Sequence, residues 1–442
     1  MLNGRNSLLT TLIFFLLVNG LQAQDASVSI SLEEAILEAS GNNKSILISR
    51  TDEKIAEANY RQTNAVFLPQ ASVSYTAMTT NNPLNVFGFK LQQQSVTGND
   101  FNPAQMNNPS ATQNYMTRAD VQLPLLNIDM LYLRKAAQKQ IEFSQLKSQR
   151  NQEYIQFDVQ SAYLQVQLSY ETVAVLEEAY VAAKATFDFT ENRFQQGLLQ
   201  KPDALNSKIH LATADRQLSE AKSNIKNASD YLSILMGKQP GVVYLVDRMP
   251  DVKFETVSAA SEVSDGRADL RALQVAIEST GYVSKSSSMS YLPKLNAFGV
   301  YQLNDKEALG FNSKSYLAGL QLSWDIFKGT KTKHTIEAKN LEKDKLVRQL
   351  EEQKNQSRSE LEKSYRQLTD TELAIQQYRI AIEQAEEAER ILKDRYQQGL
   401  VNTTDVLMAS SQSAQQKLAL SQVIFKHHVT IAYLNFLTST TH

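Results

Sequence analysis

The chain has 442 residues, a formal net charge of −2 and no cysteine. This length suits two or three ordinary domains or one elongated one. The near-neutral charge gives no general attraction to nucleic acid. The lack of cysteine excludes disulfides, thiolate metal sites and a lipidated N-terminal cysteine, so a lipoprotein is not expected.

The first residues predict export. Arg5 supplies a positive charge, and an apolar run follows from Leu8 to Val18. A charged start, a short apolar run and a small residue at the cut site are typical of a secretory signal peptide. We therefore expect residues 1–23 to be a signal peptide. No later segment holds about 20 continuous apolar residues, so no membrane-spanning helix is expected.

A segment of thirteen residues occurs twice in this chain with few differences. RFQQGLLQKPDAL runs from Arg193 to Leu205, and RYQQGLVNTTDVL runs from Arg395 to Leu407. A match of this quality at a fixed separation indicates an internal duplication. The expected divisions are a first structural repeat at 24–236, an inter-repeat linker at 237–266 and a second repeat at 267–442.

Alternating apolar and polar residues predict two strands in each repeat. In the first repeat the strands flank a stretch at 79–117 that is rich in Asn, Gln and Pro, which predicts a long loop. In the second repeat they are expected near 295–303 and 316–324. Such alternation suits a strand with one apolar and one polar face. Phe87 and Phe89 in the loop are either interfacial aromatics at a barrel rim or packed loop residues.

Each repeat is strongly helical outside its strands. A moderate helix is expected before the strands, at about 43–65 and 265–288. Residues 129–196 and 330–398 contain no proline, and at 1.5 Å per residue each stretch could span roughly 100 Å. Residues spaced 3, 4, 3, 4 form a heptad seam in each repeat, which predicts coiled-coil packing. The two seams are Leu211, Ala214, Leu218, Ala221, Ile225, Ala228, Leu232 and Leu235, and Leu361, Ser364, Leu368, Thr371, Ile375, Tyr378, Ile382 and Ala385.

The duplicated motif predicts the tip of a helical hairpin. Gly197 and Gly399 stand where a helix ends in the left-handed conformation. Asp203 and Asp405 suit the positive end of the helix that follows. The two tips are expected near 197–203 and 399–405.

No sequence motif indicates a catalytic site. The five histidines show no metal-ligand spacing, and the chain lacks a G-x-S-x-G motif, a P-loop and a dinucleotide fingerprint. We expect no enzyme activity, no cofactor and no bound metal.

The order helix, Leu-Pro strand, loop, strand, long helix, R-[FY]-x-x-G-L tip and long helix occurs twice. In this arrangement the whole mature chain resembles the TolC-like outer-membrane efflux protein family. The resemblance implies a mainly α fold with a β-barrel portion. Four strands cannot close a barrel alone. A homotrimer would form a 12-stranded outer-membrane β-barrel on a periplasmic α-helical tunnel.

The resemblance implies a passive exit duct of a tripartite efflux or type I secretion system in the cell outer membrane. The implied partners are a periplasmic adaptor (membrane fusion) protein, an inner-membrane pump of the RND, ABC or MFS type, and outer-membrane lipid. The alternative is a periplasmic coiled-coil adaptor or structural protein that does not insert in the outer membrane. Adaptors also carry long helical hairpins, so this alternative stays open.

The resemblance also implies roles for the tips. The residues that match the turns meeting the adaptor are Gly197, Leu198, Gly399 and Leu400. The residues that match the periplasmic entrance gate are Asp203, Tyr396 and Asp405. For the two aspartates, stabilisation of the helix dipole is the alternative. Val401 replaces an arginine of the best-known member, and Met408 replaces a second acidic residue, so neither that salt-bridge lock nor a doubled acidic ring is implied here.

Overall fold

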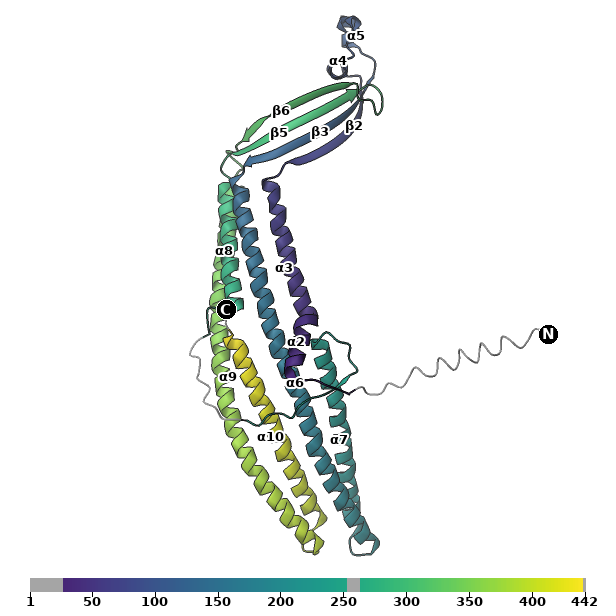
Figure 1. Ribbon diagram of the computed structural model, residues 1–442, viewed down its shortest axis with the longest axis vertical. Helices are drawn as coiled ribbons and strands as arrows, with labels where there is room; N and C mark the ends of the chain where they lie inside the picture. The colour runs from purple at the N-terminus through teal and green to yellow at the C-terminus, as the bar shows by residue number, and fades with distance from the viewer. Residues whose placement is uncertain (1–26, 253–262, 440–442) are drawn as a thin grey trace, which may run out of the picture. The chain divides into compact units, whose positions relative to one another are not determined.

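The computed structural model describes residues 27–252 and 263–439, so the expected signal peptide at 1–23 lies outside the described residues. The chain divides into two compact units, which Figure 1 shows as a ribbon. We call the first the hairpin unit; it comprises Met1–Thr51, Lys147–Leu270 and Glu352–His442. We call the second the sheet unit; it comprises Asp52–Leu146 and Arg271–Glu351.

The expected helices are present, with bounds that differ by a few residues. They are α3 (Lys44–Gln62, continued by the 3-10 turn η1, Thr63–Val66), α6 (Ile128–Gln195), α7 (Lys201–Leu235), α8 (Ala268–Met289), α9 (Lys331–Gln397) and α10 (Thr403–Thr438). Within the described ranges, no helix is both long and apolar enough to cross a membrane.

Helix α2 (Leu32–Asn42) and strand β1 (Ser27–Ser29) were not expected. Ser31 and Glu34 form a capping box at the start of α2, in which each side chain accepts a hydrogen bond from the other residue's backbone N–H, at 3.2 and 2.9 Å. Ser-x-x-Glu is the sequence signature of this cap, and it was available in the sequence. Strand β1 pairs in parallel with β4 (Val243–Leu245), which lies in the inter-repeat linker.

The heptad seams form the core of the hairpin unit. Their central members are buried, as the spacing predicts: Leu218, Ala221, Ile225, Leu232 and Leu235 in α7, and Leu361, Ser364, Leu368, Thr371 and Ile375 in α9. Ala228 and the outer members of the seams are half-buried. Alternating large and small residues at the seam let neighbouring helices pack closely along their length.

The sheet unit contains an antiparallel sheet that is four-stranded within the described residues, in the order β2-β3-β5-β6. The strands are β2 (Gln70–Thr80), β3 (Thr112–Leu126), β5 (Lys294–Asp305) and β6 (Ser313–Ser323). The strands of one repeat therefore pair directly with those of the other, and β2 and β6 are the two edges.

The expectation of one long loop at 79–117 is wrong. This stretch contains helix α4 (Pro83–Gln92), the 3-10 turn η2 (Gly98–Phe101), helix α5 (Pro103–Asn107) and the start of β3 at Thr112. Two Asn-Pro pairs explain the helices. Asn82 and Asn102 each accept backbone N–H groups of the following turn, and each precedes a proline at the first helical position. Phe87 packs edge-to-face on Phe101 at 5.7 Å, so it is a packed residue of this segment.

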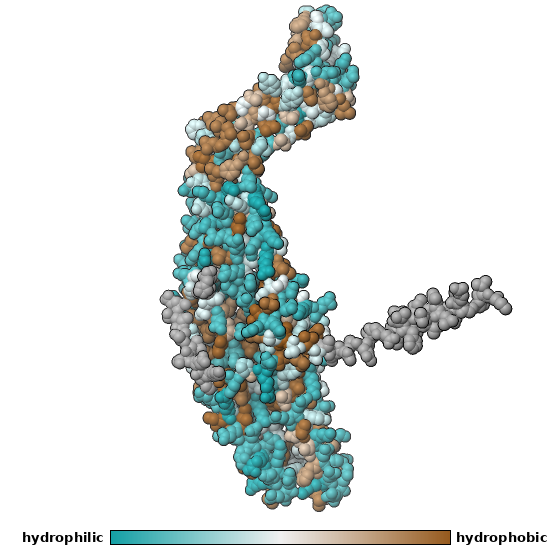
Figure 2. Space-filling model, in the orientation of Figure 1, coloured by the Kyte–Doolittle hydropathy of each residue, from teal (hydrophilic) through white to brown (hydrophobic). Residues whose placement is uncertain are grey.

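The strand register sorts the side chains of the sheet onto two faces. Val73, Ala119, Tyr301 and Tyr316 form one cross-strand row, and Ser74, Arg118, Gln302 and Ser315 form the adjacent row on the opposite face. Apolar residues on the first face are exposed, with 75% of Val73 and 83% of Tyr316 accessible to solvent. Figure 2 shows hydrophobic side chains gathered over one end of the sheet. We call the face that carries the Val73 row the apolar face, and the face that carries the Ser74 row the polar face.

Candidate functional site: the two hairpin tips

The first helix of each hairpin ends in the same way. Gly197 has φ +75° and Gly399 has φ +77°, both in the left-handed region predicted from the motif. At the first tip the Gly197 N–H donates to the Phe194 carbonyl and the Leu198 N–H donates to the Arg193 carbonyl, both at 2.9 Å. The second tip repeats this pattern. These two bonds form a Schellman motif, which satisfies carbonyl groups that the helix leaves free.

The second helix of each hairpin starts differently at the two tips. At α10 the Asn402 side chain accepts the Asp405 N–H at 2.9 Å, and the Asp405 carboxylate accepts the Asn402 N–H at 3.4 Å. At α7 the cap residue Gln200 makes no side-chain cap, and Asp203 lies in the first turn after Pro202. Asp405 is therefore a helix-capping residue, whereas Asp203 carries its charge at the helix N-terminus without that bond.

Tyr396 joins the two hairpins through one hydroxyl group. Its ring is 6% exposed, and its oxygen lies 2.8 Å from the Thr190 hydroxyl of α6 and 2.9 Å from the Thr403 hydroxyl of α10. The Thr190 hydroxyl donates its only proton to the Thr186 carbonyl at 2.7 Å. It must therefore accept from Tyr396, which in turn accepts from Thr403. The three hydroxyls form a directional chain from α10 to α6.

The sequence did not indicate this chain of hydroxyls. Tyr396 was expected at the gate through the resemblance, but Thr190 lies seven residues before the repeated Gly-Leu pair and carries no motif. Thr190 is 0% exposed in the structure. The available signal was a polar residue on the buried side of a helix, facing the expected position of Tyr396. Buried hydroxyls need hydrogen-bond partners, so such a residue is a candidate partner.

Arg193 acts across the tips as well as within its own helix. It lies in the last turn of α6, and its guanidinium donates to the Gln397 carbonyl at the end of α9 at 3.0 Å. The guanidinium also lies over the Phe189 ring at 4.8 Å. A positive group at the carbonyl end of a helix is favourable because it offsets the helix dipole. Arg193 therefore stabilises the end of the other hairpin.

The tips present apolar side chains to solvent. Leu198 is 64% exposed and Leu400 is 66% exposed. Each leucine follows the left-handed glycine, so the turn directs it away from the helices it connects. Met408 is also exposed, and Val401 is half-buried. The two tips thus offer matched apolar groups at equivalent positions.

Ion pairs link the hairpins further from the tips. Lys417 of α10 contacts Glu178 of α6 and Glu386 of α9, each at 2.9 Å. Burial lowers the pKa of Lys417, but its bonds to Glu386 and Glu178 outweigh that effect and raise the pKa above its ordinary value. A lysine shared by two carboxylates on different helices fixes the spacing of the hairpins.

The sequence matches one protein family over most of its length. The model of the outer membrane efflux protein family matches residues 35–238 and 259–432. The chain belongs to the outer membrane efflux protein family. Among curated proteins, none matches the chain significantly. The two matched ranges cover most of both repeats.

Solved structures of outer-membrane channels have the same fold. VceC of Vibrio cholerae is 16% identical with a TM-score of 0.75, and the alignment covers 92% of this chain and 96% of VceC. CmeC of Campylobacter jejuni is 16% identical with a TM-score of 0.76, covering 92% of this chain and 85% of CmeC. The open state of MtrE of Neisseria gonorrhoeae is 14% identical with a TM-score of 0.71, covering 92% and 88%. At these identities the likeness concerns the fold.

An outer membrane efflux protein transports rather than transforms its substrates. In the described part of the chain, no group of three or more His, Asp or Glu side chains is arranged to hold a metal ion. The tips combine helix caps, a hydroxyl chain and exposed leucines. This arrangement suits positioning and contact.

Proposed function

We propose that this efflux protein is the outer-membrane exit duct of a tripartite export system, built from three copies of the chain. The observation that carries the proposal is the sheet with one exposed apolar face, one polar face and two open edges. An exposed apolar face of this extent suits contact with lipid. The polar face then lines an aqueous lumen. Edges left open in one chain are closed by pairing with neighbouring copies, giving a twelve-stranded barrel.

The tips support the periplasmic half of the proposal. Leu198 and Leu400 are the groups we assign to adaptor contact, because exposed apolar residues at matched positions favour a protein partner. Asp203, Tyr396 and Asp405 are the groups we assign to the entrance. The inner-membrane pump would reach the duct through the adaptor.

The test is the single-channel conductance of purified protein in a planar bilayer. Asp203→Asn/Asp405→Asn removes two charges per chain and keeps side chains that can still cap helices. If the aspartates ring the entrance, the wild type is cation-selective and the double variant loses much of that selectivity. A control pair, Asp215→Ala/Asp370→Ala, removes the same charge from exposed positions away from the tips.

The outcomes separate the two function classes. If the protein conducts and the tip substitutions do not change its ion selectivity, the duct is supported and both aspartates act only in helix stabilisation. Folded protein that never conducts, and that mild washing releases from membranes, supports the periplasmic adaptor or structural protein instead.

A further inference from the structure

The connections of the sheet divide its two ends. At one end each strand adjoins a helix of its own repeat, through α3, α6, α8 or α9. At the other end, residues 81–111 connect β2 to β3 and residues 306–312 connect β5 to β6. We call residues 81–111 the α4–α5 segment. Because α3 precedes β2 and α6 follows β3, this segment lies at the end of these two strands that is remote from both helices.

Three side chains of the polar face are buried at this end. Asn114 is 0%, Asn304 1% and Ser313 2% exposed. The register places all three on the same face as Ser74, because each lies an even number of residues from a member of the Ser74 row. Ser74 itself is exposed. Something therefore covers the polar face at this end and leaves it open further along.

The cover is the C-terminal end of α4. The Gln93 side chain donates to the Asn114 amide oxygen at 3.0 Å and to the Gln113 carbonyl at 2.7 Å. Asn114 in turn donates to the Asn304 amide oxygen at 3.0 Å. The Ser313 hydroxyl donates to the Gln92 carbonyl. The bonds of Gln93 and Gln92 join α4 to β3 and β6, and the Asn114 bond extends the cluster to β5. The side chains of Asn114, Asn304 and Ser313 lie on the polar face.

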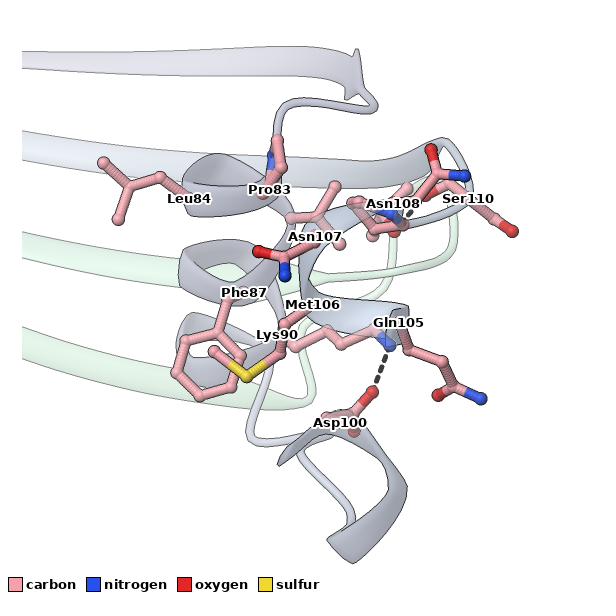
Figure 3. Close-up of a pocket in the computed structure, with 13 residues that line it drawn as sticks. Pro83, Leu84, Phe87, Lys90, Asp100, Gln105, Met106, Asn107, Asn108 and Ser110 are labelled. Atoms are coloured by element: carbon pink, nitrogen blue, oxygen red, sulfur yellow. Dashed lines mark hydrogen bonds and ion pairs between the residues drawn. The ribbon is translucent and has the colours of Figure 1, made fainter. Parts of the chain in front are cut away.

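The α4–α5 segment is folded. Lys90 of α4 pairs with Asp100, and that contact, with help from Thr97, lowers the pKa of Asp100 to about 2. Phe87 packs on Phe101. Figure 3 shows Phe87, Lys90 and Met106 around a hollow of about 570 Å³ between α4 and α5. A segment with its own helix caps, ion pair and aromatic pair keeps its shape over the polar face.

We infer that the α4–α5 segment covers the exit of the duct and limits the size of the molecules that leave it. The inference rests on the proposed function, in which the polar face lines the lumen. The amide cluster holds the cover down, and in a ring of three copies three such covers converge on one exit. The tips belong to the hairpin unit and the α4–α5 segment to the sheet unit, so a size limit at the exit can be tested independently of the tips.

The absence of cysteine allows the test to be made with single introduced thiols. Ser74→Cys places a thiol on the polar face, and Val73→Cys places one on the apolar face of the same strand. Cells that carry the full-length protein are treated from outside with a small charged thiol reagent or with a maleimide on a bulky polyethylene glycol. The rate at which each reagent labels the introduced thiol is then measured.

The cover predicts a size-dependent result. The small reagent labels the Ser74→Cys protein, whereas the bulky reagent labels it slowly. Adding Gln93→Ala to the Ser74→Cys protein removes the amide that holds α4. The labelling rate with the bulky reagent should then rise on the order of tenfold, while the labelling rate with the small reagent should stay the same. Gln92→Ala is the matched control, because the Gln92 side chain is exposed and its carbonyl remains. Asn304→Ala, made in parallel, removes the same cluster from the strand side.

Two failures are distinguishable. Fast labelling of Ser74→Cys by the bulky reagent, unchanged by Gln93→Ala and Asn304→Ala, overturns the cover and leaves the duct standing. A Ser74→Cys protein that resists even the small reagent, beside a Val73→Cys protein that reacts, shows that the polar face does not line an aqueous path. That second result removes the proposed function itself.

Discussion

At the scale of single residues, the tips depend on hydrogen-bond geometry more than on charge. Tyr396 makes both of its hydroxyl bonds to threonines on other helices, and its ring packs against Phe189 at 5.1 Å. Gly197 and Gly399 hold left-handed turns that any other residue except asparagine would strain. Val401 brings no charge to the second tip. The hydroxyl chain supplies a neutral link between the hairpins.

Tyr396→Phe tests that link. The substitution keeps the ring and deletes the oxygen, so the Thr403 hydroxyl loses its buried acceptor, at a cost of about 1–3 kcal/mol. We expect faster hydrogen exchange at both tips and a lower unfolding midpoint of the purified protein. Tyr378→Phe, also on α9, is the control, because within the described residues its hydroxyl makes no hydrogen bond. Equal exchange in the wild type and Tyr396→Phe would contradict the assigned role.

At the scale of elements, the packing of α10 against α9 contains a buried histidine. His427 is 2% exposed, and among the described residues its Nδ1 has no hydrogen-bond partner. Its Nε2 lies 3.8 Å from a Glu372 carboxylate oxygen of α9, too far for a hydrogen bond. Burial, with a smaller contribution from His428, lowers the pKa of His427. The helix pair therefore folds around a neutral imidazole.

This geometry predicts acid sensitivity of the α9–α10 pair. Because the folded pKa lies below the unfolded value of about 6.5, stability is fully present above that value and is lost as pH falls through the folded pKa. His427→Leu keeps the position filled and removes the titration. In thermal unfolding measured from neutral to mildly acidic pH, the wild type should lose stability over this window and the variant should lose less. His210→Gln, an exposed histidine on α7, should behave as the wild type. An identical acid response of His427→Leu would rule out this residue as the cause.

At the scale of the whole molecule, the sheet is incomplete within one chain. Within the described residues, strands β2 and β6 each have a free edge, and exposed edges of this length are normally protected. The apolar face adds a second unmet requirement, since Tyr316, Leu320 and Leu322 are all exposed. In the function that we propose, assembly of copies around a common axis meets the first requirement, and lipid meets the second.

The predicted assembly has three copies. Native mass measurement of the protein extracted in mild detergent should give three times the mass of one mature chain. The species should resist detergent until heated, because backbone pairing of β2 of one copy with β6 of the next joins the copies. The tip variant Asp203→Asn/Asp405→Asn lies far along the chain from these strands and should give the same mass. A folded monomer as the main species would refute the closed ring.

The sequence by itself determined the features that depend on local spacing. The glycine caps at 197 and 399, the heptad seams, the alternating strands and the duplication all follow from residues close together in the chain, and they predicted most of the helices and strands. The capping box at Ser31 and the Asn-Pro starts at Asn82 and Asn102 belong to the same kind of local signal.

Only the tertiary structure decided which distant residues meet. Pairing of β3 with β5 joins the two repeats and sorts every side chain of the sheet onto one of two faces. Thr190 meets Tyr396 because α6 and α9 lie together at the tips, and Gln93 meets Asn114 because α4 folds back over the strands. Such contacts depend on long-range packing and on the burial of polar groups that must find partners. Residue spacing within a segment carries no record of them, so the cover over the polar face could be seen only in the folded chain.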